Sequence, residues 1–209
     1  VSKEELASIS VPSSLETSLG TLGFFDGVPD DDTVSKVYDN LDLIRCVQVV
    51  LDAIGAGSMY RLRAANKKLG ADRCNKVMIF EKLLDSQPLY LTGNTSTLYA
   101  QAYLDTEVDG PTVIEVPPGM LGAINDAWFR YVGDLGVIGP DKGKGGKYLV
   151  LPPGYKGDVP SGYFVVRPRT FWTWAMVRGS TAQGLANEVK AMEGAIRIYP
   201  LAKAKNPPK

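Results

Sequence analysis

The sequence contains no histidine among its 209 residues and carries no net charge. Without histidine, the usual general base of nucleophilic triads and the imidazole ligand of most catalytic zinc sites are both missing. Lysine and arginine number 23, as do aspartate and glutamate, so no excess positive charge favours a nucleic-acid partner. Any catalysis must use carboxylate, hydroxyl, amine or thiol groups, and the sequence predicts neither a cofactor nor a metal site.

Cysteines and long apolar runs are also scarce. The two cysteines, Cys46 and Cys74, lack the spacing of a redox or zinc motif, and two buried thiols are favoured over one disulfide. The longest apolar stretch, residues 47–54, is interrupted by Gln48 and Asp52 and is too short to cross a bilayer, so no membrane partner is predicted. The hydrophobic content of 44% is that of a soluble globular chain with a sizeable core.

The first eighty residues predict an arm and a helical hairpin. Residues 1–30 form the arm, with one short helix at 13–19, and residues 31–80 form the hairpin. Its first helix starts at Asp31 or Asp32, where acidic residues act as caps rather than calcium ligands, and ends at Gly55 and Gly57. Its apolar second half should be covered nearly all round. The second helix runs from Ser58 to Leu69, and a left-handed residue is expected at Gly70.

Residues 81–209, together with the end of the preceding segment, predict short strands separated by glycine, proline and asparagine. Because few helices intervene, an antiparallel sandwich or barrel is favoured. In residues 98–104, alternation places leucine and alanine on one face and Tyr99, Gln101 and Tyr103 on the other. A late helix is predicted at 183–192. The predicted strands are 77–80, 88–92, 97–104, 112–116, 127–132, 147–151, 163–167, 172–178 and 195–199.

Three groups of polar and aromatic residues are candidate ligand contacts. Asn94, Thr95 and Thr97 precede Tyr99 and either form a rim of hydrogen-bonding groups or merely hold a turn. Trp128 and Arg130 would share one side of a strand, where an arginine can stack on the indole and grip a carboxylate, or else cover a core edge.

The third group repeats this combination of tryptophan and arginine on a later strand. Trp172, Trp174, Met176 and Arg178 share one face by alternation. Tryptophans in sandwiches usually belong to the core. Because the tryptophans are assigned to the core, Arg178 is the predicted ligand-binding residue of this third group.

The segment GPDKGKGGKY, residues 139–148, is rich in glycine and lysine. It lacks the spacing of a nucleotide-binding phosphate loop, so a mobile or tightly turned loop is favoured, with an anion or sugar-acid contact through Lys142, Lys144 or Lys147 as the alternative. Several carboxylates could pair for glycoside hydrolysis, but their spacing along the chain does not show which of them meet. These are Asp105, Glu107, Asp109, Glu115 and Asp126.

Several stretches resemble the DUF1254 family of domains of unknown function. They include FFDGVPDDDTVSKVYDNLD at residues 24–42, the NT-x-T-x-YA turn at 94–100, IEVPPG at 114–119, the segment from Trp128 to Gly157, and RIYPL at 197–201. Ser96 departs from the aspartate that is common in this turn. The resemblance implies a helical subdomain followed by an immunoglobulin-like antiparallel β-sandwich, an α+β fold, and a second β-rich domain of the DUF1214 family beyond this chain.

The resemblance implies no established activity. The first functional hypothesis is a non-catalytic module that binds a small polar or carbohydrate-like ligand or a partner domain. The alternatives are a hydrolase whose carboxylate and tyrosine site is completed by the missing C-terminal domain, and a structural assembly component. Expected partners are that domain or a second copy of the chain, and export of many relatives favours an extracytoplasmic location.

Overall fold

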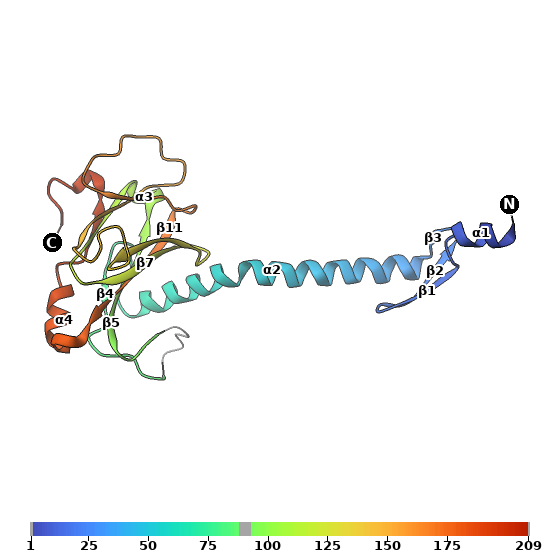
Figure 1. Cartoon of the computed structure of the whole chain (residues 1–209), viewed down its shortest axis with the longest axis horizontal. Coiled ribbons are helices and arrows are strands. Elements are labelled where there is room, and N and C mark those ends of the chain that lie inside the picture. The colour runs from blue at the N-terminus through green and yellow to red at the C-terminus, as the bar shows by residue number, and fades with distance from the viewer. Residues whose placement is uncertain (1, 88–92, 209) are drawn as a thin grey trace. The chain divides into compact units, whose positions relative to one another are not determined.

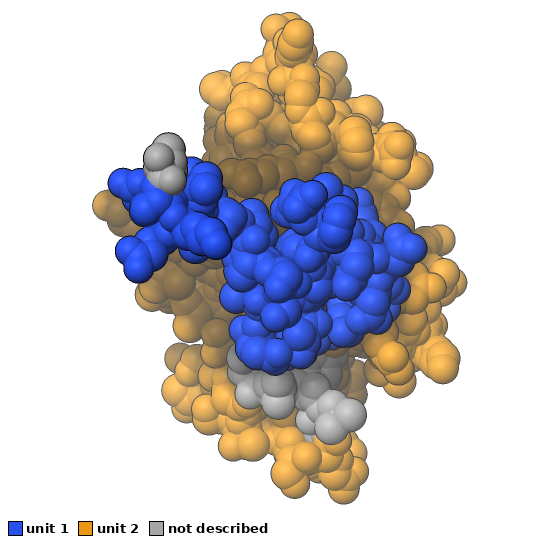
Figure 2. Space-filling view, turned by 90° about the vertical axis from the view of Figure 1, so that its right-hand side faces the viewer, with its two compact units in different colours: residues 1–54 blue, residues 55–209 orange. Residues whose placement is uncertain are grey.

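A computed structural model describes residues 2–87 and 93–208 (Figure 1). The α+β class is confirmed, because a long helix is followed by sheets whose strands run mainly antiparallel. The chain divides into two compact units, Val1–Ile54 and Gly55–Lys209, which Figure 2 shows in blue and orange. The predicted strand at 88–92 lies outside the described residues.

The first unit contains a small antiparallel sheet. Helix α1 (Lys3–Ile9) precedes strands β1 (Ser14–Thr17), β2 (Gly20–Phe25) and β3 (Val28–Pro29), which lie side by side in the order β1-β2-β3. The prediction of a helix at 13–19 is therefore wrong. A tight turn at Gly20, where φ is +92°, lets residues 14–17 pair with β2, and this pairing overrides the local helical preference.

Helix α2 (Asp31–Lys68) begins at a side-chain cap. The Thr33 backbone N–H donates to the Asp30 carboxylate at 2.7 Å, and the Thr33 hydroxyl accepts from the Gly23 amide at 2.7 Å. The hydrogen bonds from Thr33 to the Asp30 carboxylate hold its pKa below the ordinary value. The prediction that acidic residues cap this helix is confirmed.

The predicted hairpin is wrong, because α2 continues without a break through Gly55, Gly57 and Ser58 to Lys68. A Cβ atom on Gly55 would lie 2.5 Å from the Trp128 carbonyl oxygen, so glycine at this position permits a close approach rather than ending the helix. The helix stops before Gly70, whose φ of +101° matches the left-handed residue that was predicted there.

The second unit contains two facing sheets. One has the order β10-β9-β6-β12 and the other β4-β5-β11-β7-β8. Every neighbouring pair is antiparallel except β10 with β9. The strands are β4 (Met78–Ile79), β5 (Thr97–Asp105), β6 (Thr112–Val116), β7 (Leu121–Asp126), β8 (Tyr131–Gly136), β9 (Gly146–Val150), β10 (Phe164–Val166), β11 (Trp172–Ser180) and β12 (Arg197–Pro200).

Short helices fill the connections of this unit. They are α3 (Thr106–Asp109), α4 (Leu185–Met192) and the 3₁₀ turns Thr181–Gln183 and Leu201–Lys203. Helix α4 matches the late helix that the sequence predicts. Its Met192 is fully buried and belongs to the main core.

The main core lies between the two sheets and confirms the predicted faces of β5. Leu98, Ala100, Ala102 and Leu104 point inward and pack with residues of the opposite sheet, such as Ile114 and Val150. Apolar side chains of both sheets thus form one continuous cluster, as expected for stacked sheets. The immunoglobulin-like topology implied by the family resemblance stays a prediction.

The strand predicted at 127–132 is wrong over residues 127–130 and right at 131–132, where β8 begins. Residues 127–130 form the turn between β7 and β8, and Phe129 has a φ of +61°. The carboxylate of Asp126, which is 1% exposed, accepts hydrogen bonds from the backbone N–H groups of Trp128 and Arg130 at 2.9 and 3.0 Å. Such a side-chain cap competes with a sheet ladder and closes the turn.

Both cysteines are free thiols, but the prediction that both are buried is wrong. Cys46 is exposed on α2, whereas Cys74 is partly buried beside Arg63, whose Nη2 lies 3.3 Å from its sulfur. Burial raises the pKa of the Cys74 thiol above its ordinary value.

Candidate functional site

The outer face of the five-stranded sheet carries a band of aromatic and polar side chains. Tyr99, Gln101 and Tyr103 alternate on β5 with the inward-pointing core residues. On β11, Arg178 lies opposite Tyr99, Met176 opposite Gln101, and Trp174 opposite Tyr103. The strand register therefore places each of the three β5 side chains directly beside one of the three β11 side chains.

The C-terminal part of α2 covers one end of this band. Met59, which is 6% exposed, packs with Tyr103 and Trp174. The Arg63 guanidinium stacks 3.5 Å from the centre of the Trp172 ring, within the range of a cation–π contact. The ring of Phe129 lies 5.8 Å from that of Trp174. At the Arg178 end of the band, the described residues that line a pocket include none from α2.

A pocket of about 80 Å³ lies at that end. Its walls combine apolar side chains, a phenol, an indole, an amide and a guanidinium. This combination is typical of sites for small organic ligands, in which a few polar groups fix the orientation of the ligand. The lining residues are Phe80, Leu84, Gly93, Tyr99, Gln101, Trp174, Met176 and Arg178.

Arg178 supplies the charge of the pocket. Its guanidinium carbon lies 5.8 Å from the centre of the Tyr99 ring. Its Nε is shielded from solvent and has no hydrogen-bond partner among residues 2–87 and 93–208. Leaving a buried donor of a charged group without an acceptor is costly.

The other polar groups of the pocket are held by neighbours. The indole Nε1 of Trp174 donates to Gln101 Oε1 at 2.8 Å. The Tyr99 hydroxyl accepts from the backbone N–H of Asn94 at 2.9 Å and from its Nδ2 at 2.8 Å. Tyr99 and Gln101 are therefore fixed in position, which preorganises the walls around Arg178.

The predicted polar rim at Asn94, Thr95 and Thr97 is a turn. The Asn94 Oδ1 atom accepts from the backbone N–H and the hydroxyl of Thr97, both at 2.9 Å, and Thr95 is exposed. None of these three residues lines the pocket. They act on it indirectly, because Asn94 also holds the Tyr99 hydroxyl.

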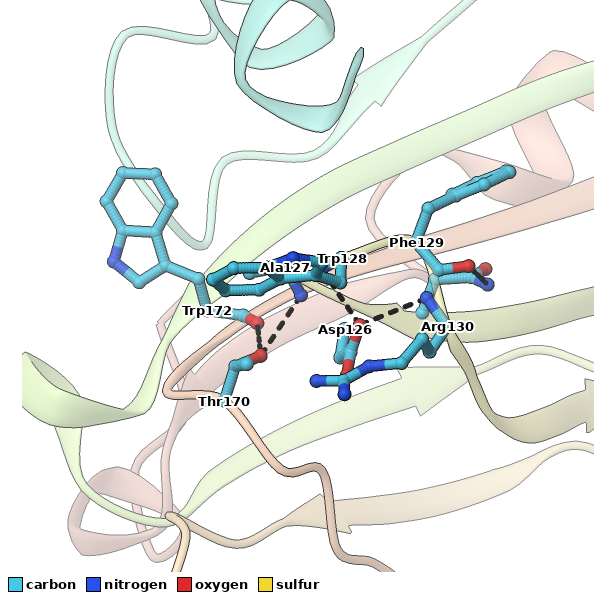
Figure 3. A network of polar contacts seen from close by, with 8 residues as sticks. Asp126, Ala127, Trp128, Phe129, Arg130, Thr170 and Trp172 are labelled. Atoms are coloured by element: carbon cyan, nitrogen blue, oxygen red, sulfur yellow. Dashed lines mark hydrogen bonds and ion pairs between the residues drawn. The ribbon is translucent and has the colours of Figure 1, made fainter. Parts of the chain in front are cut away.

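Trp128 and Arg130 lie apart from this pocket, at the turn that follows β7 (Figure 3). Arg130 Nε donates to Asp126 Oδ2 at 2.7 Å, and its guanidinium lies 5.9 Å from the centre of the Trp128 ring. The Thr170 hydroxyl accepts from the Ala127 N–H at 3.0 Å and ties this turn to the next loop. Arg130 therefore lies within cation–π range of Trp128, but both residues belong to a turn and not to the predicted strand.

The lysines of the glycine-rich loop differ in their contacts. The backbone N–H groups of Lys142 and Lys144 donate to carbonyl oxygens of the loop itself, at 3.0 Å each, so these amides are used in tight turns. Lys147 lies in β9 and pairs with Glu115, with 3.2 Å between Nζ and Oε1. The loop is thus tightly turned.

Four of the five carboxylates that were considered for hydrolysis, all except Glu107, contact neighbouring side chains. Glu115 accepts from Lys147, Arg197 and Tyr199. Asp126 pairs with Arg130, and Asp105 accepts from the Trp172 indole at 2.7 Å. Across the described part of the chain, no three histidine, cysteine, aspartate or glutamate side chains gather as a metal site would require.

The sequence pointed to Tyr99 and Arg178 but missed most of the pocket walls. Trp174 and Met176 share a face with Arg178 by alternation, yet tryptophan there suggested core packing. Phe80 and Leu84 precede β5 and carry no local signal for a site. The pocket forms because the register between β5 and β11 brings these residues together. Local sequence patterns do not predict this register, since the two strands are far apart in the sequence.

The comparisons with known proteins agree on the fold. The VPA0106 protein from Vibrio parahaemolyticus has a similar crystal structure, with a TM-score of 0.56 and 18% identity. The match covers 76% of this chain, which spans only 38% of that protein. No curated protein matches. The model of the family described as "Protein of unknown function (DUF1254)" matches residues 74–200, so this chain belongs to the DUF1254 family.

Proposed function

We propose that this protein is a non-catalytic β-sandwich module that binds a small carboxylate, such as a sugar acid, in the Arg178 pocket. The observation that carries the proposal is the Arg178 guanidinium in the wall of the pocket, whose Nε lacks a hydrogen-bond partner among the described residues. A carboxylate would accept a charge-assisted hydrogen bond from this guanidinium, and such a bond is stronger than one between neutral groups.

The walls of the pocket restrict the ligand further. A water needs roughly 10–15 Å³ of such space, so a pocket of about 80 Å³ has room for a carboxylate and several further water-sized groups. The faces of Tyr99 and Trp174 favour a flat or ring-shaped body next to the charged group. Glu115 and Asp126 already make ion pairs, so the hydrolase alternative gains no support from them.

An extracytoplasmic location is part of this proposal. The family resemblance supports it, since many relatives are exported. Helix α2 is also long and apolar enough, by length and composition, to resemble an export or membrane segment. Fractionation of cells that produce the full-length protein would test the location, and recovery only in the cytoplasm would contradict it.

The ligand class is tested by calorimetry with matched pairs of compounds, such as glucuronate with glucose and galacturonate with galactose. We expect heat from the acids and none from the neutral sugars. Arg178→Lys should weaken binding by about tenfold, because a lysine loses the fork geometry, and Arg178→Met should abolish binding.

Arg169→Met provides the control, because Arg169 is an exposed arginine that does not line this pocket. Its binding should equal that of the wild type. Absence of heat with every acid, or equal binding by Arg178→Met, would refute the proposal. Near-ultraviolet circular dichroism confirms that each variant is folded.

A further inference from the structure

A second cavity, of about 330 Å³, lies in the second unit apart from the Arg178 pocket. Its walls come from the turn after β7, the start of β8 and the segment that follows β10. Among the described residues, the two cavities have no lining residue in common. Three arginines line the second cavity, namely Arg130, Arg167 and Arg169, which we call the arginine cluster.

Two guanidinium groups of the arginine cluster are available to a ligand. Arg130 Nε donates to Asp126 Oδ2 at 2.7 Å, and Asp126 is the one carboxylate that lines this cavity among residues 2–87 and 93–208. Within the same described ranges, the side chains of Arg167 and Arg169 make no ion pair or hydrogen bond. The cavity therefore presents two positive charges that no carboxylate in its walls balances.

The backbone holds the arginine cluster in place. The residue before a proline is confined to extended backbone, and burial alternates over residues 166–169, where Pro168 is buried between two exposed arginines. Both arginines therefore project from the same side of the segment. The Thr170 hydroxyl accepts from the Ala127 N–H at 3.0 Å, which ties this segment to the turn that carries Arg130 (Figure 3). Part of the ordering needed for binding is thus already present.

A neighbouring cavity of about 280 Å³ extends the site. Tyr131, Val132 and Arg167 line both cavities. Asp134 also lines the neighbouring cavity, and its carboxylate accepts from the Tyr131 hydroxyl at 2.8 Å. This carboxylate repels a second anionic group but can accept hydrogen bonds from hydroxyl groups. The two cavities together favour a ligand with an anionic group at one end and a neutral, hydroxyl-bearing body.

We propose that the arginine cluster binds the phosphate group of a soluble sugar phosphate, whose sugar lies in the neighbouring cavity. A phosphate monoester carries a charge of about −1.5 to −2 at neutral pH, which matches the two unbalanced guanidinium groups better than the single charge of a carboxylate does. The planar fork of arginine also fits phosphate oxygens. This site does not depend on the carboxylate site proposed at Arg178.

The test is calorimetry with glucose 1-phosphate, and with glucose as the uncharged control. A salt concentration of about 0.15 M reduces the screening length to about 8 Å, so that distant charges contribute little. The test variant combines Arg167→Met with Arg169→Met. The matched control combines Arg61→Met with Arg73→Met, which removes the same charge at exposed positions that line neither cavity. Near-ultraviolet circular dichroism verifies that each variant is folded.

We expect glucose 1-phosphate to bind equally to the wild type, to the Arg61/Arg73 variant and to Arg178→Met. The Arg167/Arg169 variant should bind it about a hundredfold more weakly, or about tenfold for each arginine, and should still bind glucuronate as the wild type does. Glucose should give no heat. Because each ligand is lost from a different variant, failure at one site is distinguished from failure at the other.

Three results would overturn the proposal. Absence of heat from glucose 1-phosphate would exclude a soluble sugar phosphate, and flotation of the wild type with vesicles that contain phosphatidic acid would then assign the arginine cluster to a lipid headgroup. Equal weakening in the Arg61/Arg73 variant would show a general effect of charge. Loss of binding in Arg178→Met alone would place the phosphate in the first pocket.

Discussion

Glu115 illustrates how a single side chain organises the outer face of the four-stranded sheet. It lies between Lys147 on β9 and Arg197 on β12, and the Tyr199 hydroxyl donates to Oε1 at 2.5 Å. Burial raises the pKa of Glu115, but the hydrogen bonds from Tyr199, Arg197 and Lys147 outweigh it, so its pKa lies below the ordinary 4.5. The charged form of Glu115 therefore stabilises the fold.

A pH dependence follows from this lowered pKa. The stabilising contribution of Glu115 is fully present above pH 4.5, the value in the unfolded chain, and is lost as the pH falls through the lower folded value. Glu115→Gln should lower the free energy of unfolding by about 2 kcal/mol at neutral pH. Urea denaturation at neutral and acidic pH measures both effects, and the difference between wild type and variant should shrink in acid.

Glu107→Gln provides the control for this experiment, because Glu107 is exposed and its carboxylate makes no contact seen in residues 2–87 and 93–208. This variant should unfold like the wild type at every pH. A Glu115 variant as stable as the wild type at neutral pH would show that the three donors do not favour the charged carboxylate.

At the scale of elements, α2 shows how a glycine inside a helix can be required by a neighbour. Glycine is a poor helix former, which explains why the sequence pattern predicted an end at Gly55 and Gly57. The two glycines differ in their surroundings. A Cβ atom would meet the Trp128 carbonyl oxygen at Gly55, whereas it would meet nothing within 4 Å at Gly57.

The two glycines therefore predict opposite effects for the same substitution. Gly57→Ala should stabilise the protein by roughly 0.5–1 kcal/mol, since alanine favours the helix and has open space. Gly55→Ala should destabilise it by about 2 kcal/mol, because the methyl group forces α2 away from the turn after β7. Thermal unfolding of the two variants measures the difference, and stabilisation by both would disprove the close contact.

The sequence predicted most elements of the sandwich because alternation is a local property. Residues 98–104 show two faces of period two, and both lie where alternation places them. The sequence-based prediction failed at 127–130, because the Asp126 carboxylate accepts hydrogen bonds from backbone N–H groups there. It also failed at 13–19, because pairing with β2 decides the conformation of that segment. It identified Tyr99 and Arg178 separately, but their meeting depends on the register between two distant strands.

At the scale of the whole molecule, hydrophobic packing is concentrated in the second unit. All three clusters of buried apolar residues that the structure describes lie between Met59 and the C-terminal segment. The family model matches residues 74–200, within the same unit. The driving force for folding of this unit therefore comes from its own residues.

A fragment that starts at Gly55 should consequently fold on its own. We expect it to unfold cooperatively in urea and to bind the same carboxylates as the full chain. Trp128, Trp172 and Trp174 all lie in this unit, so tryptophan fluorescence follows its unfolding directly. Loss of a cooperative transition in the fragment would show that the core needs residues 1–54.

The two thiols have very different surroundings. Cys46 is exposed on α2, while burial raises the pKa of Cys74 and slows its conversion to the reactive thiolate. A maleimide dye can thus be attached to a single natural site. A dye at Cys46 would then report on the surroundings of α2 during unfolding, without engineering the chain.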